Sequence, residues 1–310
     1  METALVTGGA GFIGSHIVDA LIGRGYTVAV IDDLSSGQKE NLAEGVKLFE
    51  MDVASPDVAK AFDEVKPDVV YHEAAQMDVR RSVDDPLFDA TVNILGGLNI
   101  YENCVRTGVK KVIFASSGGA AYGEQEVFPA TEEHPKQPLS PYGIAKYANE
   151  NYLYYYYKTH GLKSIALRYA NVYGPRQNPR GEAGVVAIFS TKMLNGEIPT
   201  INGTGKQTRD YVFVGDVAAA NMAALDHDVE SLDAFNVGTG IETDVNELCE
   251  SIRKAVGVDI DVPHGPAMAG EQMRSVIDWK KLNQVTGWKP SMSIDEGITE
   301  TVAWFRENEV

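Results

Sequence analysis

The chain has 310 residues, a length that predicts two closely packed units. Hydrophobic residues make up 44% and charged residues 23%, a composition typical of a globular protein. This composition disfavours a disordered chain, a collagen-like repeat and a coiled coil. No apolar run approaches the roughly 20 residues that a membrane-spanning helix needs. A net charge of -17 disfavours a nucleic-acid surface.

The two cysteines, Cys104 and Cys249, are far apart in the sequence, and the six histidines show no ligand spacing. We therefore expect reduced thiols and no metal site. The N-terminus lacks the basic flank and cleavage site of a signal peptide. Together these features favour a cytoplasmic protein.

Short β-rich runs alternate with helical patterns over the first half of the chain. Strands are predicted at Thr3–Thr7, Thr27–Asp32, Lys47–Met51, Asp68–His72, Lys111–Ser116 and Ser164–Tyr169. Helices are predicted near Gly11–Arg24, Asp57–Val65, Leu87–Arg106 and Tyr142–Thr159. Most of the strands are rich in Val, Ile and Ala without polar alternation, so both of their faces should be buried. This repetition implies βαβ crossovers, and we predict an α/β fold with a doubly wound, parallel Rossmann-type sheet.

After about Asn171 the pattern changes to a loop rich in Gly and Pro, followed by helices with short strands between them. These helices are predicted near 185–195, 215–226, 244–256, 278–285 and 294–308. We therefore expect a dinucleotide-binding domain over 1–174 and a smaller C-terminal α/β substrate lobe over 175–310. A strand predicted near 234–238 returns to the first domain, so the two parts are interleaved.

A glycine pattern lies between the first strand and the first helix. Gly8 permits a tight turn, Gly11 lets the backbone approach a pyrophosphate, and Gly14 allows the helix to pack closely on the strand. The N-terminus of the helix offers free N–H groups to phosphate. The alternative is a glycine-rich turn without a ligand. Asp32 ends the second strand and can accept the ribose hydroxyls, and with Asp33 it repels a 2′-phosphate, which favours NAD over NADP.

A Tyr-x-x-x-Lys pair opens the helix predicted after Ser140-Pro141. Residues four apart share one helical face, so the ammonium of Lys146 can lie near the hydroxyl of Tyr142. A nearby cation favours the phenolate, and Tyr142 then becomes a usable base near neutral pH. The alternative is an ordinary surface tyrosine and lysine.

Together, the motifs of this chain resemble the extended short-chain dehydrogenase/reductase superfamily, in its NAD-dependent epimerase/dehydratase family and the UDP-glucose 4-epimerase branch. The segments that carry the resemblance are Thr7–Ser15, Asp32–Gly37, His72–Ala75, Asn93, Ser140–Tyr142, Leu167–Pro175 and Thr208–Tyr211. The resemblance implies bound NAD and epimerisation at C4 of a UDP-hexose through a 4-keto intermediate, which interconverts UDP-glucose and UDP-galactose. A UDP-uronate 4-epimerase and a non-catalytic NAD-binding sensor stay open as alternatives.

The resemblance also implies a role for each matching residue. It assigns cofactor contacts to Gly8, Gly11, Phe12, Ile13, Gly14, Asp32, Asp33, Leu34, Ser35, Ser36, Gly37, Asp52, Val53, Ala74, Ala75, Asn93, Tyr142, Lys146 and Tyr169. It assigns catalysis to Ser117, Tyr142 and Lys146, and substrate contacts to Ser117, Tyr142, Asn171, Arg209, Arg274 and Ser275. Within that set, Arg209 is expected on the diphosphate, because a guanidinium makes bidentate bonds to phosphate oxygens.

The glycine loop after the fifth strand departs from the pattern of the family. A catalytic Ser or Thr usually stands four residues before the Tyr of a Tyr-Gly pair, and here that position is Gly118. We expect Ser117 to take the role, with Ser116 as the alternative. Dehydratases and decarboxylases of the same branch carry a carboxylate in this stretch. Its absence here favours an epimerase.

A second departure lies near the C-terminus. Met268 stands where an Arg commonly holds the β-phosphate, and Arg274 is the candidate replacement. Ser275 matches a position beside the C2 substituent of the sugar, where a small residue leaves room for an acetamido group. We therefore expect N-acetylated UDP-hexoses to be accepted as well.

Two predicted helices carry more apolar residues than a sheet should bury. These residues are Leu95, Leu98, Ile100 and Tyr101 in the helix predicted near 87–106, and Tyr152 to Tyr157 in the helix predicted near 142–159. Such a surface usually marks an interface, and related enzymes pair these helices, so we expect a homodimer. The alternative is that the tyrosines cover the sheet edge of a monomer.

Overall fold

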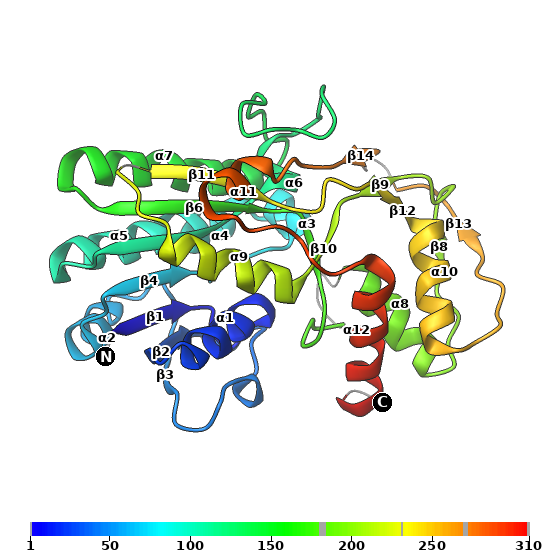
Figure 1. Ribbon diagram of the computed structural model, residues 1–310, viewed down its shortest axis with the longest axis horizontal. Helices are drawn as coiled ribbons and strands as arrows, with labels where there is room; N and C mark the ends of the chain where they lie inside the picture. Colours follow the sequence, from blue (N-terminus) through cyan, green and yellow to red (C-terminus); the bar gives the residue numbers. More distant parts are fainter. Residues whose placement is uncertain (1, 180–183, 231, 269–271, 309–310) are drawn as a thin grey trace.

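The computed structural model describes residues 2–179, 184–230, 232–268 and 272–308. Within them, a seven-stranded sheet forms the larger part of the molecule, and all of its strand pairs are parallel (Figure 1). Its strands, in spatial order, are β11 (Leu232–Val237), β6 (Lys163–Tyr169), β5 (Lys111–Ser117), β4 (Val69–His72), β1 (Thr3–Thr7), β2 (Thr27–Asp32) and β3 (Lys47–Glu50). The order reverses between β1 and β4, where ligands bind in doubly wound sheets. The predicted α/β fold class is confirmed.

Helices cover both faces of the sheet (Figure 1). One layer contains α1 (Phe12–Gly23) and α9 (Val214–Asp226), and the other contains α2 (Val58–Val65), α5 (Gly96–Thr107) and α7 (Pro141–His160). Successive residues of a strand point to opposite faces. In β1, Val6 packs in the α1 layer with Ile17, whereas its neighbour Leu5 packs in the α2 layer with Phe62. This double burial explains the continuous apolar strands.

The helix predicted over Leu87–Arg106 is interrupted in the structure. Over that range the chain forms α4 (Pro86–Ala90), a π-helical turn η2 (Thr91–Leu95) and then α5, and a short helix that was not predicted, α3 (Val79–Asp84), precedes them. Asn93 lies buried in the π-helical turn, where its amide donates to the backbone oxygen of Gln76 and to Asp89 Oδ1, both at 2.9 Å. These two hydrogen bonds accompany the local change of helical pitch, and π-turns are frequent at functional sites.

A smaller lobe packs beside the sheet (Figure 1). Its helices α8 (Val185–Leu194), α10 (Val245–Val256) and α12 (Ile294–Asn308) share an apolar core that includes Phe189, Leu248 and Val302. Short strands pair in small separate sheets among the described residues: β7 (Asn171–Tyr173) with β10 (Tyr211–Phe213), β9 (Thr208–Arg209) with β12 (Thr243–Asp244) and β14 (Arg274–Ser275), and β8 (Ile201–Asn202) with β13 (His264–Gly265). The remaining elements are η1 (Lys39–Asn41), α6 (Gly118–Ala121) and α11 (Lys280–Thr286).

In the described ranges, no helix is both long enough and apolar enough to cross a membrane. Cys104 and Cys249 are both buried free thiols.

Candidate active site

The glycine turn after β1 lies against the loop after β4, at the point where the strand order reverses. Gly8 has φ +68, and a Cβ there would lie 2.7 Å from the backbone nitrogen of Ala74. A Cβ on Gly14 would lie 2.2 Å from the oxygen of Gly8. Only glycine allows backbone to approach this closely. Gly11 begins α1 with no side-chain cap among the described residues, so backbone N–H groups at Phe12 and Ile13 suit an anion.

The two carboxylates at the end of β2 lie in different environments. Asp32 is 6% exposed and accepts the backbone N–H groups of Ala10 and Leu34, each at 2.9 Å. Burial raises the pKa of Asp32, and the hydrogen bond from Leu34 opposes that rise. Asp33 is exposed and accepts from Ser35 within its own turn. Asp32 therefore faces the glycine loop, with Ser36 and Gly37 following in the same turn.

Two further loops complete this edge of the sheet. Asp52 is exposed and accepts the N–H of Ala54, whereas the adjacent Val53 is buried. Ala74 donates its N–H to Thr7 Oγ1 at 3.2 Å, which fixes the segment that contains Ala75.

The start of α7 brings together the Tyr-x-x-x-Lys pair. Ser140 accepts the N–H of Gly143 at 3.1 Å, and Pro141 occupies the first turn, which fixes where the helix begins. Lys146 is 4% exposed, and its ammonium lies 5.7 Å from the ring centre of Tyr142. It donates to the oxygen of Ala115 in β5 at 2.8 Å. Burial lowers the pKa of Lys146 to about 8, and Glu73 opposes that shift.

The two neighbouring serines at the end of β5 have different environments. Ser116 is buried and donates to Glu150 Oε1 at 2.6 Å. Ser117 is half-buried and accepts the N–H of Ala120 as the N-cap of α6. Ser116 is thus committed to an interior acceptor, and Ser117 keeps its own O–H for another partner.

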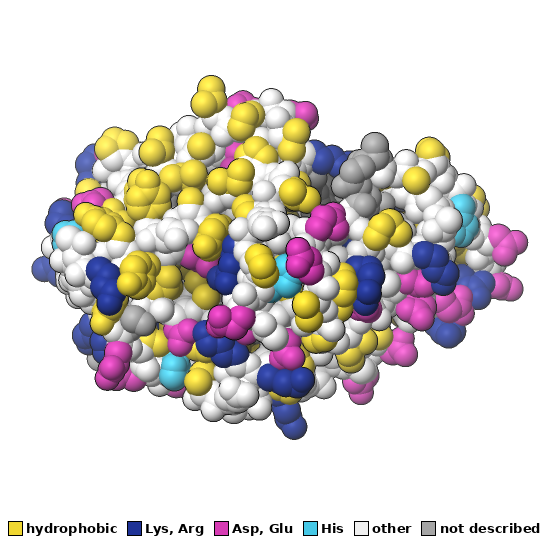
Figure 2. Space-filling view, turned by 90° about the horizontal axis from the view of Figure 1, so that it is seen from above, with side chains coloured by type: hydrophobic (Ala, Val, Ile, Leu, Met, Phe, Trp, Pro, Cys, Tyr) yellow, Lys and Arg dark blue, Asp and Glu magenta, His cyan; other side chains and the backbone are white. Residues whose placement is uncertain are grey.

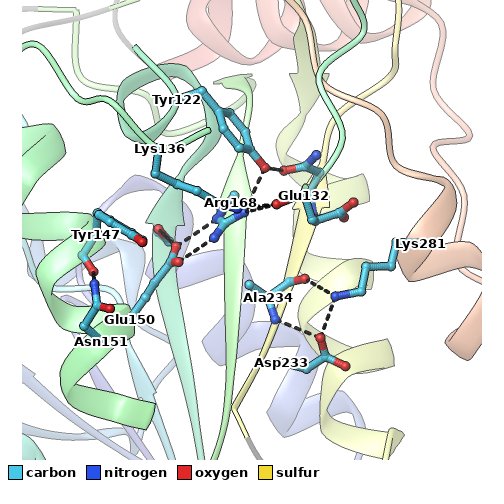
Figure 3. A network of polar contacts seen from close by, with 12 residues as sticks. Tyr122, Glu132, Lys136, Tyr147, Glu150, Asn151, Arg168, Asp233, Ala234 and Lys281 are labelled. Carbon is cyan, nitrogen blue, oxygen red and sulfur yellow. Dashed lines mark hydrogen bonds and ion pairs between the residues drawn. The ribbon is translucent and has the colours of Figure 1, made fainter. Parts of the chain in front are cut away.

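Glu150 belongs to a buried polar network that sequence reasoning missed (Figure 3). Arg168 donates to both carboxylate oxygens of Glu150, at 2.9 and 2.6 Å, and to the hydroxyl of Tyr122 at 2.9 Å. Tyr122 in turn donates to Asn236 Oδ1 at 2.6 Å. The network joins α7, β6 and β11, and Ser116 at the end of β5 also donates to it. The signal was present, because Glu150 follows Lys146 by four residues and so shares its helical face.

Four predicted substrate residues lie on the short strands of the lobe. Asn171 in β7 is paired with Tyr211 in β10, and Arg209 in β9 is paired with Ser275 in β14. Ser275 is 4% exposed, and its Oγ lies 4.0 Å from where a Cβ on Gly119 would stand. The structure thus brings Ser275 beside the glycine loop that follows Ser117.

Arg274 is already paired with another residue. It donates to both oxygens of Glu242, at 2.8 and 2.7 Å, and lies over the ring of Phe128. A phosphate there would have to compete with that carboxylate. Met268, at the position where an Arg is common, is contacted by Arg80, whose guanidinium lies 3.1 Å from the thioether sulfur. The guanidinium of Arg209 donates to the backbone oxygen of Thr208.

Tyr169 ends β6 at the same edge and is 6% exposed. Its hydroxyl donates to Glu73 Oε1 at 3.2 Å and accepts from Asn221 at 2.8 Å. In the part of the chain that the structure describes, no cluster of three or more His, Cys, Asp or Glu residues could hold a metal ion.

The chain belongs to the NAD dependent epimerase/dehydratase family, whose model matches residues 4–238. The family and NAD as its cofactor, both inferred from the motifs, are confirmed. The chain is similar to the UDP-glucose 4-epimerase of Thermotoga maritima, solved with UDP-glucose, at 46% identity and a TM-score of 0.96 over 98% of this chain and 99% of the other.

Two more solved structures are similar over almost the whole chain. The UDP-glucose 4-epimerase of Thermus thermophilus, in complex with NAD, is 47% identical with a TM-score of 0.93 and covers 99% of this chain and 100% of its own. The UDP-N-acetylglucosamine 4-epimerase of Methanobrevibacter ruminantium, in complex with UDP-N-acetylmuramic acid, is 38% identical with a TM-score of 0.93 over 99% and 98% of the two chains.

Proposed function

We propose that the protein is an NAD-dependent 4-epimerase that interconverts UDP-glucose and UDP-galactose through a 4-keto sugar. The observation that carries this proposal is the constellation of Ser117, Tyr142 and Lys146 at the carboxyl edge of the sheet. The stretch Gly118–Ala121 after Ser117 has no carboxylate. Elimination of water would require an additional acid or base there, whereas epimerisation requires none.

The cradle fits NAD on structural grounds. The close approach of Gly8 and Ala74 and the uncapped start of α1 suit a pyrophosphate. Buried Asp32 would hold the adenosine ribose, and Asp33 beside it would disfavour a 2′-phosphate. When bound, NAD would supply reversible hydride transfer at C4 of the sugar.

The residues of the chain would manage the protons. Tyr142, as the phenolate beside the cation of Lys146, would remove the proton of the 4-hydroxyl and later return it. Ser117 would donate a hydrogen bond to the C4 oxygen while its charge changes. Arg209 would bind the diphosphate, so that the keto sugar can turn about this anchored end and present its opposite face.

The test is an assay of purified protein against UDP-glucose, UDP-galactose, their N-acetyl forms and their uronic acids, with products separated by retention and mass. We expect interconversion of glucose and galactose forms without added cofactor. Tyr142→Phe should lower turnover by about 10²- to 10⁴-fold and leave bound NAD unchanged. Turnover of the uronic acids alone would replace this proposal by a uronate epimerase, and no turnover with bound NAD would favour a sensor.

We also propose that Ser275 makes the sugar pocket permissive for N-acetylated substrates. Ser275 is buried beside Gly119, and its small side chain takes up less of the pocket than the ring of a tyrosine would. Because spare room costs little binding energy whereas overfilling costs much, Ser275 should admit the larger sugar without requiring it. Ser275→Tyr should abolish only the N-acetyl activity. If the unmodified protein turns over no N-acetyl sugar, the proposal is wrong.

Finally, we propose that the protein is a homodimer that pairs through α7 and the helices beside it. Leu95, Tyr152 and Tyr155 are 56%, 39% and 49% exposed, and a groove on α7 is lined by Ala148, Asn151, Tyr152 and Tyr155. Hydrophobic side chains gather on the part of the surface above α7 (Figure 2). An exposed apolar surface of this kind favours association.

Part of the predicted patch lies elsewhere. Ile100, Tyr101 and Tyr156 are buried in the core between the helices and the sheet, because they fall on the inner faces of α5 and α7. The interface would therefore use only the outer residues of each helix. Light scattering should give twice the 33.6 kDa mass of one chain, and Tyr155→Lys should shift it toward one copy. A mass of one chain for the unmodified protein would contradict the dimer.

A further inference from the structure

Asp210 lies where the short strands with the predicted substrate residues meet, and the mechanism above gives it no role. It separates β9 from β10 and directly follows Arg209. Its backbone N–H donates to the oxygen of Ser275 at 2.9 Å, and its backbone oxygen accepts the N–H of Asn171 at 2.9 Å. The backbone of Asp210 therefore joins three predicted substrate residues, Asn171, Arg209 and Ser275.

The carboxylate of Asp210 is buried and accepts four hydrogen bonds. The residue is 2% exposed. Its Oδ1 accepts the backbone N–H of Thr239 at 2.8 Å and the hydroxyl of the same residue at 2.6 Å. Its Oδ2 accepts the backbone N–H of Gly240 at 3.1 Å and that of Ile277 at 3.3 Å. Because each oxygen faces two donors, only the ionised carboxylate can accept from all of them.

The two segments that this carboxylate holds belong to different parts of the fold. The loop 239–240 follows β11, which belongs to the seven-stranded sheet, whereas Ile277 follows β14, the strand that contains Ser275. Space at this junction is tight, because a Cβ on Gly238 would lie 2.5 Å from Asp210 Oδ2 and 2.8 Å from Ile277 Cγ1. Asp210 thus fastens the strand of the proposed sugar pocket to the large sheet.

Ile277 in turn packs on the glycine loop that follows Ser117. It is 1% exposed, and a Cβ on Gly118 would lie 2.8 Å from Ile277 Cδ1. The side chain of Ile277 therefore fills space that a side chain on Gly118 would need. Ser275 approaches the next residue of the loop, since its Oγ lies 4.0 Å from where a Cβ on Gly119 would stand.

The other edge of the same segment is held by the loop that contains Gln125 and Ala130. The backbone N–H of Val276 donates to Gln125 Oε1 at 3.0 Å, and its backbone oxygen accepts the N–H of Ala130 at 2.9 Å. Segment 275–277 is therefore hydrogen-bonded on both edges. On the edge that faces Asp210, the bond to Ile277 is the one that depends on a side chain.

We propose that Asp210 is a positioning residue whose carboxylate fixes segment 275–277 against the glycine loop after Ser117, and so sets the distance between the sugar pocket and the catalytic hydroxyl groups. This inference rests on the proposed epimerase function. The carboxylate would touch neither sugar nor cofactor, because its two oxygens are already occupied by donors of the chain. Its loss would instead displace C4 of the sugar from Tyr142, and a shift of about 1 Å is enough to slow a reaction strongly.

The test compares Asp210→Asn with the matched control Asp216→Asn. Asp216 is 5% exposed, and its carboxylate also accepts neutral donors, the N–H and hydroxyl of Ser291 and the N–H of Met292, which lie outside the predicted substrate strands. Both variants leave buried N–H groups without an acceptor, so urea unfolding should show similar losses of stability.

Only Asp210→Asn should impair turnover. We expect its kcat for UDP-galactose to fall by at least about tenfold with KM changed by less than about threefold, because the backbone pairing of β9 that places Arg209 is kept. Gly238→Ala leaves the carboxylate in the chain but forces a Cβ against Oδ2, so it should lower kcat in the same way. Equal losses of kcat in the Asp210 and Asp216 variants would overturn the proposal.

A second measurement does not depend on turnover. Amide hydrogen exchange, followed by mass spectrometry, reports how readily segment 275–277 and the loop 239–240 open. Both should exchange faster in Asp210→Asn and in Gly238→Ala, and neither should change in Asp216→Asn. Unchanged exchange in whichever of the first two variants folds would overturn the proposal. If the unmodified protein turns over no UDP-sugar but exchange rises as expected, the epimerase function has failed and the positioning of the segment by Asp210 stands.

Discussion

Loss of the Glu150 carboxylate should destabilise the protein strongly, although Glu150 lies on a helix whose outer face is exposed. Both side chains of the Glu150–Arg168 pair are 4% exposed, and three hydrogen bonds of 2.6 to 2.9 Å end on the carboxylate. Glu150→Gln keeps the shape but leaves the guanidinium of Arg168 buried without its counter-charge. The cost of such an uncompensated buried charge is about 3–5 kcal/mol.

The assay is urea unfolding at pH 7, with the control Lys158→Gln at the exposed end of the same helix. We expect the control to change stability by less than about 0.5 kcal/mol. The double variant Glu150→Gln/Arg168→Met removes both charges, so it should be more stable than Glu150→Gln alone. A loss below about 1 kcal/mol for Glu150→Gln, or a double variant that is less stable than the single one, would refute this reasoning.

Three further predictions concern the cofactor cradle and the serines. Gly8→Ala should remove bound NAD, because the new Cβ meets the backbone of Ala74. The control Gly25→Ala also changes a glycine at positive φ, but open space surrounds it, so this variant should retain NAD. The measurement is the nucleotide released when each protein is denatured. The nucleotide released should be NAD rather than NADP. Ser117→Ala should slow turnover more than Ser116→Ala does, and Ser116→Ala should cost about 1 kcal/mol in unfolding. A larger loss of turnover in Ser116→Ala would exchange the two assignments.

The sheet could be predicted well from the sequence because its signals are local. Strands over Thr3–Thr7 and Thr27–Asp32 agree with the structure residue for residue, since apolar runs bounded by Gly and Asp define a buried parallel strand. The helix α7 likewise carries local boundary signals, because it begins at the capping residue Ser140 and ends at Gly161, whose φ is positive. Such signals need no knowledge of the rest of the chain.

Side-chain partners that are distant in the sequence could not be predicted. Arg274 was considered for phosphate, but Glu242, 32 residues earlier, holds it. Ile100 and Tyr101 looked available for an interface, yet the face of the helix that meets the sheet depends on the crossing angle of helix and sheet. The commitment of Ser116 to Glu150 required the packing of α7 on β5. Each of these contacts depends on tertiary geometry that periodicity does not encode.

The position of β11 constrains how the protein is made. The last strand of the sheet, β11, ends at residue 237 of 310 and pairs with β6, after the chain has left the sheet to form β7, α8, β8, β9, β10 and α9. During synthesis from the N-terminus, β6 must therefore wait with one edge unpaired while the next sixty or so residues emerge. An unpaired strand edge is prone to pair with another chain. Folding in the cell therefore requires that the unpaired edge of β6 is protected from other chains until β11 has been synthesised.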